Sequence, residues 1–374
     1  MTTFRPTIRS YSWRHFDPVI LVAALALTGY GALVIYSATL PRDATGVVIS
    51  EPVIRHIAVA GTGVIAMLFA ARTNYRLLDT FSWFAYGFGI ILLVAVFFLG
   101  SDRFSANRWF DLGFVTVQAS EMAKVLTIVA LAKFMSDRRD QMHTARVFLQ
   151  SLGLAALPAA LVFIEPDLGG AVMFFVIWAV MAAFAGARLR AFAILATAVL
   201  ALVPFGLITG VSEYQRDRVR IFIDPSRDEL GTGFNVLQAE TSVGAGGIFG
   251  KGLTEGTQTQ LDFLQTQQTD FIFSVLGEEL GFVGAMVLFA LFLLLIFRLL
   301  RAILKAPDTL GQLIIAGIAT MVTVQAFVAV GVNIRLVPVT GVPLPFISVG
   351  NSALLVLFVA LGIVQSVLLR QDER

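Results

Sequence analysis

Long apolar stretches alternate with short polar segments along almost the whole chain. A helix that crosses a bilayer needs about 20 apolar residues, because every backbone polar group must be satisfied inside the segment while it lies in hydrocarbon. Stretches that meet this requirement lie near residues 18–39, 53–71, 77–99, 119–135, 147–164, 168–186, 189–211, 271–297, 310–332 and 349–369. The pattern predicts an all-α, polytopic membrane protein of about ten transmembrane helices.

Composition supports a membrane as the solvent of this chain. Hydrophobic residues make up 57% of the sequence and charged residues 14%, with a mean hydropathy of +0.83, which is too apolar for an ordinary soluble domain. The first apolar stretch is long for a signal-peptide core and lacks a clear small-x-small cleavage site, which favours a retained anchor. We expect one transmembrane domain over residues 1–374. The absence of Cys excludes disulfides and thiolate metal sites.

The distribution of charge predicts the orientation of the chain. With the N-terminus inside, sixteen of the 27 Lys and Arg residues fall on the inner side, in short loops where the positive-inside rule is dependable. Eighteen of the 25 acidic residues fall on the outer side. The inner loops are too small to form a domain. Both termini are therefore expected in the cytoplasm, any chemistry is expected outside, and nothing indicates nucleic-acid binding.

Residues 212–270 form the only large hydrophilic segment, on the outer side after the seventh span. A loop of this length is too long for a passive connector between packed helices. Apolar residues recur throughout it and could anchor it on the membrane face. We expect a short helix near residues 233–242 and a glycine-hinged turn after it.

The glycine-rich run over residues 244–252 permits two interpretations. It resembles a nucleotide-binding P-loop but has Ala245 and Gly252 where that motif requires Gly and Ser or Thr. One interpretation is a turn made by glycine. The other is that its backbone amides, together with Lys251, approach a phosphate.

Asp270 ends the long loop, directly before the apolar run that begins at Phe271. The structural interpretation of an Asp at this position is a helix N-cap. Other proton acceptors are scarce outside, since His15 and His143 lie on the inner side and only His56 lies near the outer surface. A reaction that needs a general base outside would therefore depend on a carboxylate. A helix N-terminus would weaken Asp270 as a base, whereas burial beside Phe side chains would strengthen it.

Several ionisable residues fall at membrane depth in the outer half, where such groups are costly and functional by default. Glu121 and Lys124 open the fourth span at i, i+3 spacing and share a helix face. An internal ion pair and a ligand-binding role are both open for them. Arg108 and Trp109 precede this pair, and a Trp alone would be an ordinary interfacial anchor.

Two further outer segments carry acids in tight surroundings. Glu165 and Asp167 lie in a minimal turn between the fifth and sixth spans, where they are either solvated or hold a basic partner such as Arg216 or Arg218. Glu278 and Glu279, about two turns into the eighth span, are expected to pair internally rather than react. Before the tenth span, proline residues predict a stiff outer loop over residues 343–348.

Taken together, these elements resemble the SEDS family (shape, elongation, division and sporulation) and its RodA branch, over nearly the whole chain. The family's Arg-Trp and Gln-Pro-Ser-Glu-x-x-Lys elements appear as Arg108-Trp109 and as residues 118–124, which begin at Gln118. Its Glu-Pro-Asp-Leu-Gly turn appears at residues 165–169. The strongest similarity to RodA is the run GTQTQLDFL at residues 256–264, followed by TDFIF from Thr269, because FtsW, the division branch, usually differs in the first of these.

The chain departs from the family pattern at three places. Ala119 stands for the family Pro, and Gln265 stands for the Pro that usually follows Phe-Leu. The run SVGNS, beginning at Ser348, stands for Ser-Tyr-Gly-Gly-Ser. These departures concern the local backbone.

The resemblance implies a peptidoglycan glycosyltransferase of the bacterial cytoplasmic membrane. It would polymerise lipid II on the outer leaflet during elongation and rod-shape maintenance, release undecaprenyl pyrophosphate, and work with a class B penicillin-binding protein, a transpeptidase. Asp270 occupies the position of the family's essential aspartate. Inverting transfer needs a carboxylate that takes the proton of the attacking hydroxyl and cations that receive the diphosphate charge. The candidate substrate-binding residues are Arg108, Trp109, Gln118, Glu121, Lys124, Glu165, Asp167, Arg216, Arg218, Lys251, Thr269 and Ser348.

In this hypothesis Arg108 and Lys124 bind the donor diphosphate, and Glu121 orients Lys124. Three rivals remain: a lipid II flippase, an FtsW-type division polymerase, and a scaffold that only recruits a partner. Buried charges are also what a translocation path requires, although a transporter should place them near the midplane. A divalent cation such as Mg²⁺ or Mn²⁺ could bridge diphosphate and carboxylates, but no ligand cluster in the sequence demands one.

Overall fold

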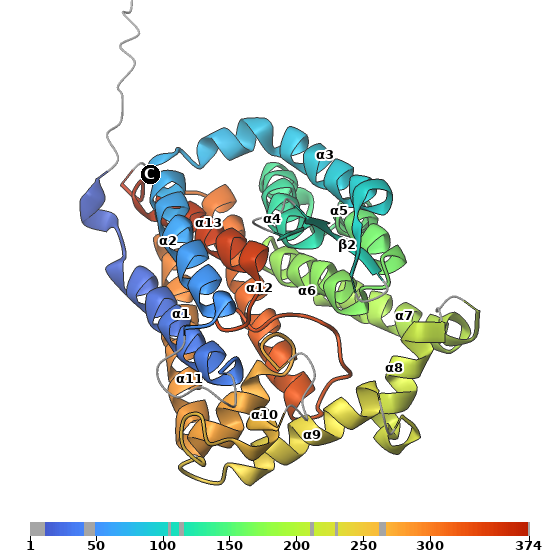
Figure 1. The fold of residues 1–374 in the computed structure, drawn as a ribbon. Helices are drawn as coiled ribbons and strands as arrows, with labels where there is room; N and C mark the ends of the chain where they lie inside the picture. Colours follow the sequence, from blue (N-terminus) through green and yellow to red (C-terminus); the bar gives the residue numbers. More distant parts are fainter. Residues whose placement is uncertain are drawn as a thin grey trace, which may run out of the picture.

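The computed structural model describes residues 12–40, 49–103, 106–111, 116–209, 213–228, 231–261 and 267–372. Within these residues, ten helices correspond one to one with the ten predicted spans, and they pack into a single bundle (Figure 1). They are α1 (Pro18–Ala38), α2 (Glu51–Arg72), α3 (Arg76–Leu99), α4 (Ala119–Asp137), α5 (Ala145–Ile164), α6 (Leu168–Phe184), α7 (Leu189–Thr209), α11 (Ile272–Lys305), α12 (Thr309–Asn333) and α13 (Asn351–Leu368). The predicted all-α polytopic class is confirmed.

Helix length and exposure fit a membrane protein. In the described residues, seven helices are long and apolar enough to cross a bilayer: α1, α2, α3, α5, α11, α12 and α13. α6 and the first part of α7 are apolar but shorter. On the outside of the bundle, Phe69, Phe84 and Phe98 are 74%, 79% and 82% exposed. Such apolar surface is unfavourable in water, so it indicates contact with lipid.

α4 brings charged side chains into the interior of the bundle. It carries Glu121, Lys124, Lys133 and Asp137. Most of its residues are nevertheless buried, since α3, α5, α6, α12 and α13 all contact it. Charges at this depth are tolerated because they face protein rather than lipid.

The predicted inner segments are joined to one another by hydrogen bonds at one end of the bundle, and the predicted outer segments are joined in the same way at the other end. At one end they join Ser12 to Leu369, Tyr75 to Asp308, and Arg139 to Thr309. At the other end they join Gln118 to Ser352, Gln267 to Ala38, and Asn333 to Asp270. The alternation of loops between two sides, predicted from the sequence, is therefore present in the fold.

A small sheet between α3 and α4 was not predicted. Its strands are β1 (Ser101–Arg103), β2 (Ala106–Asp111) and β3 (Thr116–Gln118), antiparallel in the order β1-β2-β3. Trp109 pairs with Gln118 across β2 and β3. This pairing satisfies the backbone of a connection that lies at the end of the bundle.

The long loop is largely helical. It contains α8 (Glu213–Ile223), the 3-10 helix η3 (Pro225–Arg227), α9 (Thr232–Ala245) and the short α10 (Thr257–Gln260). α9 confirms the helix predicted near 233–242, whereas α8 and α10 were not predicted. These elements lie along one end of the bundle (Figure 1). Two further 3-10 helices, η1 (Trp13–His15) and η2 (Arg139–Gln141), lie in the segments before α1 and α5.

The eighth span is broken where the sequence predicted a continuous helix. Gly281 has φ 63° and ψ −160°, so the ladder of α11 is interrupted there. The glycine-rich turn takes over the displaced hydrogen bonds. The amides of Lys251 and Gly252 donate to the carbonyls of Glu278 and Glu279 over 3.0 Å each. A positive φ is costly for any residue with a Cβ, which accounts for Gly at the break.

Candidate active site

Asp270 lies at the junction of the long loop and α11, partly exposed. α11 begins at Ile272, and Phe271 occupies its N-cap position, so the N-cap interpretation of Asp270 is wrong. In the first turn, the amide of Ser274 donates to Oδ1 of Asn333 over 2.9 Å. A side chain from α12 therefore satisfies an amide in the first turn of this helix.

Asn333, at the end of α12, holds the backbone of Asp270. Its Nδ2 donates to the Asp270 carbonyl over 2.8 Å and to the Ala329 carbonyl over 2.8 Å. Its Oδ1 accepts from both the amide and the hydroxyl of Ser274, at 2.9 and 2.7 Å. The side chain is 1% exposed, so the full capacity of a buried amide is used. Sequence reasoning missed Asn333, although a polar residue at the outer end of an apolar span was a usable signal.

The stiff loop before α13 holds the other side of this junction. The Ser348 hydroxyl donates to the Thr269 carbonyl over 2.7 Å, and the Val349 amide donates to the Gln268 carbonyl over 3.0 Å. Ser348 also accepts from the Leu344 amide at 3.0 Å. The structure thus brings together two of the predicted residues, Thr269 and Ser348. Their contact lies beside Asp270, which follows Thr269 in the chain.

Glu121 and Lys124 form an internal ion pair, as one interpretation predicted. Lys124 Nζ lies 2.7 Å from Glu121 Oε1, and the side chains are 1% and 3% exposed. Gln325 Nε2 donates to Glu121 Oε2 over 3.1 Å. Sequence reasoning missed Gln325, which lies on α12 about 12 Å along the helix axis from Asn333. α12 therefore carries both Asn333, which holds the Asp270 backbone, and Gln325, which donates a hydrogen bond to the buried ion pair.

The acidic turn between α5 and α6 is buried rather than solvated. Glu165 and Asp167 are 4% and 5% exposed, so the solvated interpretation is wrong. Asp167 Oδ1 accepts from the Gly170 amide over 2.8 Å and caps α6. The turn packs closely on the segment before the stiff loop, because a Cβ on Gly169 would lie 2.5 Å from Thr340 Cβ.

Arg218, on α8, contacts the same segment that this turn packs on. Its Nη1 donates to the Val339 carbonyl over 2.7 Å, one residue before Thr340. Val339 in turn packs in a cluster that includes Ala239 and Phe271, and Phe271 follows Asp270. Arg218 is thereby placed near the junction that carries Asp270.

A charged hollow of about 530 Å³ opens between α8 and α9. Its walls are formed by Asp217, Arg218, Arg220, Ile221, Arg227, Asp228 and Thr232. Hydrogen bonds from the Ser226 hydroxyl and the Arg227 guanidinium hold the pKa of nearby Asp224 below its usual value. The hollow is within the size range of small-ligand sites. Of its arginines, Arg220 pairs with Asp217 over 3.0 Å and Arg227 pairs with Asp224 over 3.1 Å.

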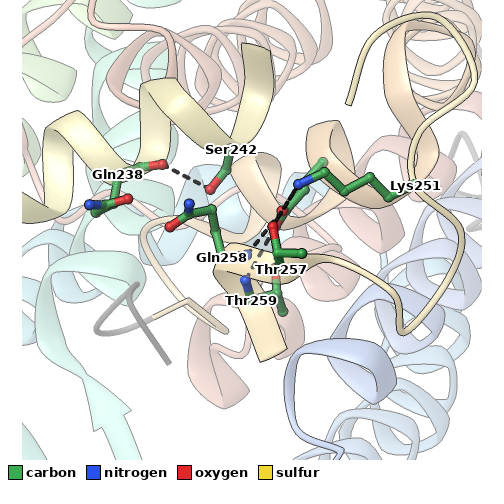
Figure 2. Close-up of polar contacts among 7 residues, drawn as sticks. Gln238, Ser242, Lys251, Thr257, Gln258 and Thr259 are labelled. Carbon is green, nitrogen blue, oxygen red and sulfur yellow. Dashed lines mark hydrogen bonds and ion pairs between the residues drawn. The ribbon is translucent and has the colours of Figure 1, made fainter. Parts of the chain in front are cut away.

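Lys251 neutralises a buried carboxylate. Its Nζ lies 2.7 Å from Glu278 Oε1 and 2.7 Å from the Thr257 hydroxyl (Figure 2). Glu278 is fully buried and also accepts from the backbone amides of Gln258 and Thr259, so its predicted internal pairing is confirmed. Because the amides of Lys251 and Gly252 bond to carbonyls of α11, the glycine-rich run is a structural turn rather than an open phosphate cradle.

Of the remaining predicted residues, the structure describes the side chains of some and not of others. Trp109 and Gln118 pair in the small sheet, with Trp109 partly exposed and Gln118 buried. Arg216 is partly exposed on α8. The side chain of Arg108 and residues 262–266 of the RodA-like run lie outside the described residues. Among the residues that the structure describes, no three His, Asp or Glu side chains lie together as metal ligands, so no step is assigned to a divalent cation.

Comparison with known proteins gives similarity over the full length. The profile of the FtsW, RodA and SpoVE family, described as cell cycle protein, matches residues 18–373. The peptidoglycan glycosyltransferase MrdB of Escherichia coli K12 is 38% identical over 357 residues, which cover 94% of this chain and 93% of MrdB. Proteins named as probable FtsW glycosyltransferases match at 32% to 35% identity.

Two solved structures have the same fold. A chain from a peptidoglycan synthase complex, described as coordinating polymerization and crosslinking, aligns with a TM-score of 0.83 at 28% identity, over 97% of this chain and all of that one. The rod shape determining protein RodA of Thermus thermophilus aligns with a TM-score of 0.69 at 26% identity, over 97% and 98%.

Proposed function

This chain belongs to the FtsW, RodA and SpoVE family of cell cycle proteins, and on that premise we propose that Asp270 is the general base of its reaction. The chain is a peptidoglycan glycosyltransferase of the RodA type that polymerises lipid II into glycan strands. The observation that carries the proposal is the clamp of Asn333 and Ser348 around Asp270. It fixes the backbone of a partly exposed carboxylate at the start of α11.

The reaction requires one proton acceptor and one stabilised leaving group. A hydroxyl of the acceptor saccharide attacks the anomeric carbon of the donor, and the bond from that carbon to the diphosphate oxygen breaks. Asp270 takes the hydroxyl proton, and undecaprenyl pyrophosphate leaves with the electron pair. A positioned base of this kind typically contributes about 100-fold or more to the rate.

The cations that we assign to the leaving group belong to the outer loop and the small sheet. Arg218 is held on Val339, beside the cluster that includes Phe271, and Arg216 lies on the same helix. Arg108 lies on β2, and its contact with the donor stays a prediction. These arginines would receive the charge that develops on the diphosphate, for which their planar donors are well suited.

Lys124 takes a different role from the one expected from the sequence. With 1% of its side chain exposed, it is enclosed by the protein. Glu121, Lys124 and Gln325 instead lock α4 to α12. We therefore assign this buried group to positioning of the helix that carries Asn333.

The orientation of the protein in the membrane supports catalysis outside. The end of the bundle with both termini carries the connections rich in Lys and Arg, whereas Asp270 lies at the other end. By the positive-inside rule, the termini are cytoplasmic and the active site is extracytoplasmic, in the bacterial inner membrane. Donor and acceptor are both lipid-linked, which accounts for a catalyst built almost entirely of transmembrane helices.

The partner is a class B penicillin-binding protein. A neighbour in fold comes from a complex that coordinates polymerization and crosslinking, and crosslinking is the reaction of a transpeptidase. The similarity to MrdB and to RodA, together with the run GTQTQLDFL, favours elongation and rod shape over the division role of FtsW.

A lipid II transport assay and a polymerisation assay, run on the same liposomes, separate the enzyme from the flippase. We expect purified protein, with its partner, to convert lipid II on the accessible face into glycan strands that separate by length on a gel. Liposomes in which lipid II crosses the bilayer while no strands form would refute the proposed function. Strands that also form with heat-denatured protein would indicate a contaminant and count against it equally.

A further inference from the structure

Four glutamines of the long loop have amide oxygens that are buried and accept no hydrogen bond from the described residues. They are Gln238, Gln258, Gln267 and Gln268. A buried acceptor that lacks a donor is unfavourable, and most such groups in native proteins are satisfied. A donor other than the described residues is therefore expected at these oxygens, such as water or a ligand.

Two of these side chains belong to helices of the long loop that contact one another. Gln238 belongs to α9 and Gln258 to α10, and Figure 2 shows the Gln258 amide pointing toward α9, beside Ser242. Both side chains are partly exposed although their oxygens are covered. The Ser242 hydroxyl already donates to the backbone carbonyl of Gln238, over 2.8 Å.

The backbone of both glutamines is held by neighbouring contacts. The backbone amide of Gln258 donates to Glu278 Oε1 over 3.0 Å. This hydrogen bond connects α10 to α11. Gln238 precedes Ala239, which is fully buried in the cluster with Phe271. Since Phe271 follows Asp270, the pair of glutamines borders the junction that carries the proposed base.

The chemistry of the pair is neutral. Lys251, the cation drawn beside it, is neutralised by Glu278 at 2.7 Å. Amides both donate and accept, which suits hydroxyl and N–H groups of a sugar, whereas a diphosphate is better served by the arginines around the charged hollow. A prenyl chain offers no donor at all.

We propose that Gln238 and Gln258 form a subsite for the saccharide of the lipid-linked substrate, with their amide oxygens accepting from sugar hydroxyl or N–H groups. This inference rests on the proposed function and names the part of the substrate that this side of the site recognises.

The test compares two lipids that share the prenyl chain and the diphosphate. Equilibrium binding of lipid II and of undecaprenyl pyrophosphate is measured for the full-length protein and for the double variant Gln238→Met/Gln258→Met, which keeps side-chain length. We expect lipid II to bind about tenfold more weakly to the variant, as loss of two hydrogen bonds predicts. We expect the affinity for undecaprenyl pyrophosphate to stay within experimental error.

Thermal unfolding of the same variant separates recognition from structure. Because the two oxygens have no partner among the described residues, we expect no fall in Tm, and Gln150→Met, at an exposed glutamine of α5, serves as the matched control. Equal loss of both lipids, a fall in Tm that accounts for the loss, or unchanged affinity for lipid II would overturn the proposal; in the last case the oxygens bind water only. Wild-type protein that binds neither lipid would instead refute the proposed function.

Discussion

The backbone around Asp270 is held by side chains that are distant in the sequence. Asn333 lies 63 residues away and Ser348 bonds to Thr269 across 79 residues. A general base must be held within a fraction of an ångström of its working position, and such support comes from surrounding side chains whose own geometry is locked. The catalytic position of Asp270 therefore depends on α12 and on the stiff loop as much as on α11.

Asn333→Ala tests the role of this clamp. It leaves the Asp270 carbonyl and the first turn of α11 without their partners, at a cost of about 1–3 kcal/mol for each buried group. We expect a lower Tm and a polymerisation rate reduced by about tenfold or more, since about 1.4 kcal/mol corresponds to tenfold. Thermal unfolding and lipid II polymerisation of the purified variant measure both.

Two further variants make this result specific. Asn333→Asp keeps the acceptor for Ser274 but loses the donor to Asp270, so its activity should fall more than its Tm. Thr323→Ala removes a hydrogen bond within α12, from the Thr323 hydroxyl to the Ala319 carbonyl, and should change neither. Wild-type activity and stability for Asn333→Ala would show that the clamp is dispensable.

Among the elements, α1 approaches the stiff loop more closely than a side chain permits. A Cβ on Gly31 would lie 2.7 Å from both Ile347 Cα and the Phe346 carbonyl oxygen, whereas a Cβ on Gly29 meets nothing within 4 Å. Phe346 already has a positive φ of 64°. The loop that bonds to Thr269 is thus seated directly on the backbone of α1.

Gly31→Ala should displace this loop, whereas Gly29→Ala, one half-turn away, should not. Overpacking a buried contact costs about 1–3 kcal/mol, so we expect a lower Tm and reduced polymerisation for Gly31→Ala. Gly29→Ala should be neutral or slightly stabilising, because Ala is the better helix former. The two variants would be compared in one detergent by thermal unfolding and by polymerisation rate. Equal behaviour of the two would contradict the close approach.

The elements could be predicted only where the sequence pattern carries them. Ten spans and the helix at α9 follow from apolar length and composition. The break at Gly281 and the sheet before α4 were missed, because hydropathy says nothing of backbone dihedrals or of short strand pairing.

At the site, the position of Asp270 came from family resemblance and the i, i+3 spacing gave the Glu121–Lys124 pair. Gln325 was missed because its partner, Glu121, lies 204 residues away. Asn333 and Ser348 belong to the same class of contact, which exists only after α12 and the stiff loop have packed. The burial of Glu165 and Asp167 was also beyond local pattern, since a short polar turn is exposed unless another segment covers it.

For the whole molecule, the two ends of the bundle differ in chemistry. The end with both termini is held by contacts such as Tyr75 with Asp308, whereas the other end carries the long loop and Asp270. The proposed orientation puts the second end outside the cell. Because the chain has no Cys, single-cysteine variants report accessibility without background.

Asp140→Cys and Glu255→Cys, both at exposed positions, test the orientation. A thiol reagent that does not cross membranes should label Glu255→Cys in spheroplasts and should label Asp140→Cys only after the membrane is opened. The reverse order of labelling would place the termini outside and would contradict extracytoplasmic catalysis by Asp270.

Polymerisation of lipid II by Asp270→Asn tests the assigned general base most directly. Amide replaces carboxylate with almost no change in shape, so lipid II binding and Tm should be retained, while the rate of glycan strand formation should fall by about 100-fold or more, the contribution typical of a general base. Asp224→Asn, at an acid of the same loop that pairs with Arg227, is the matched control and should polymerise at the wild-type rate. Glycan strands made by folded Asp270→Asn at the wild-type rate would contradict the role assigned to this residue.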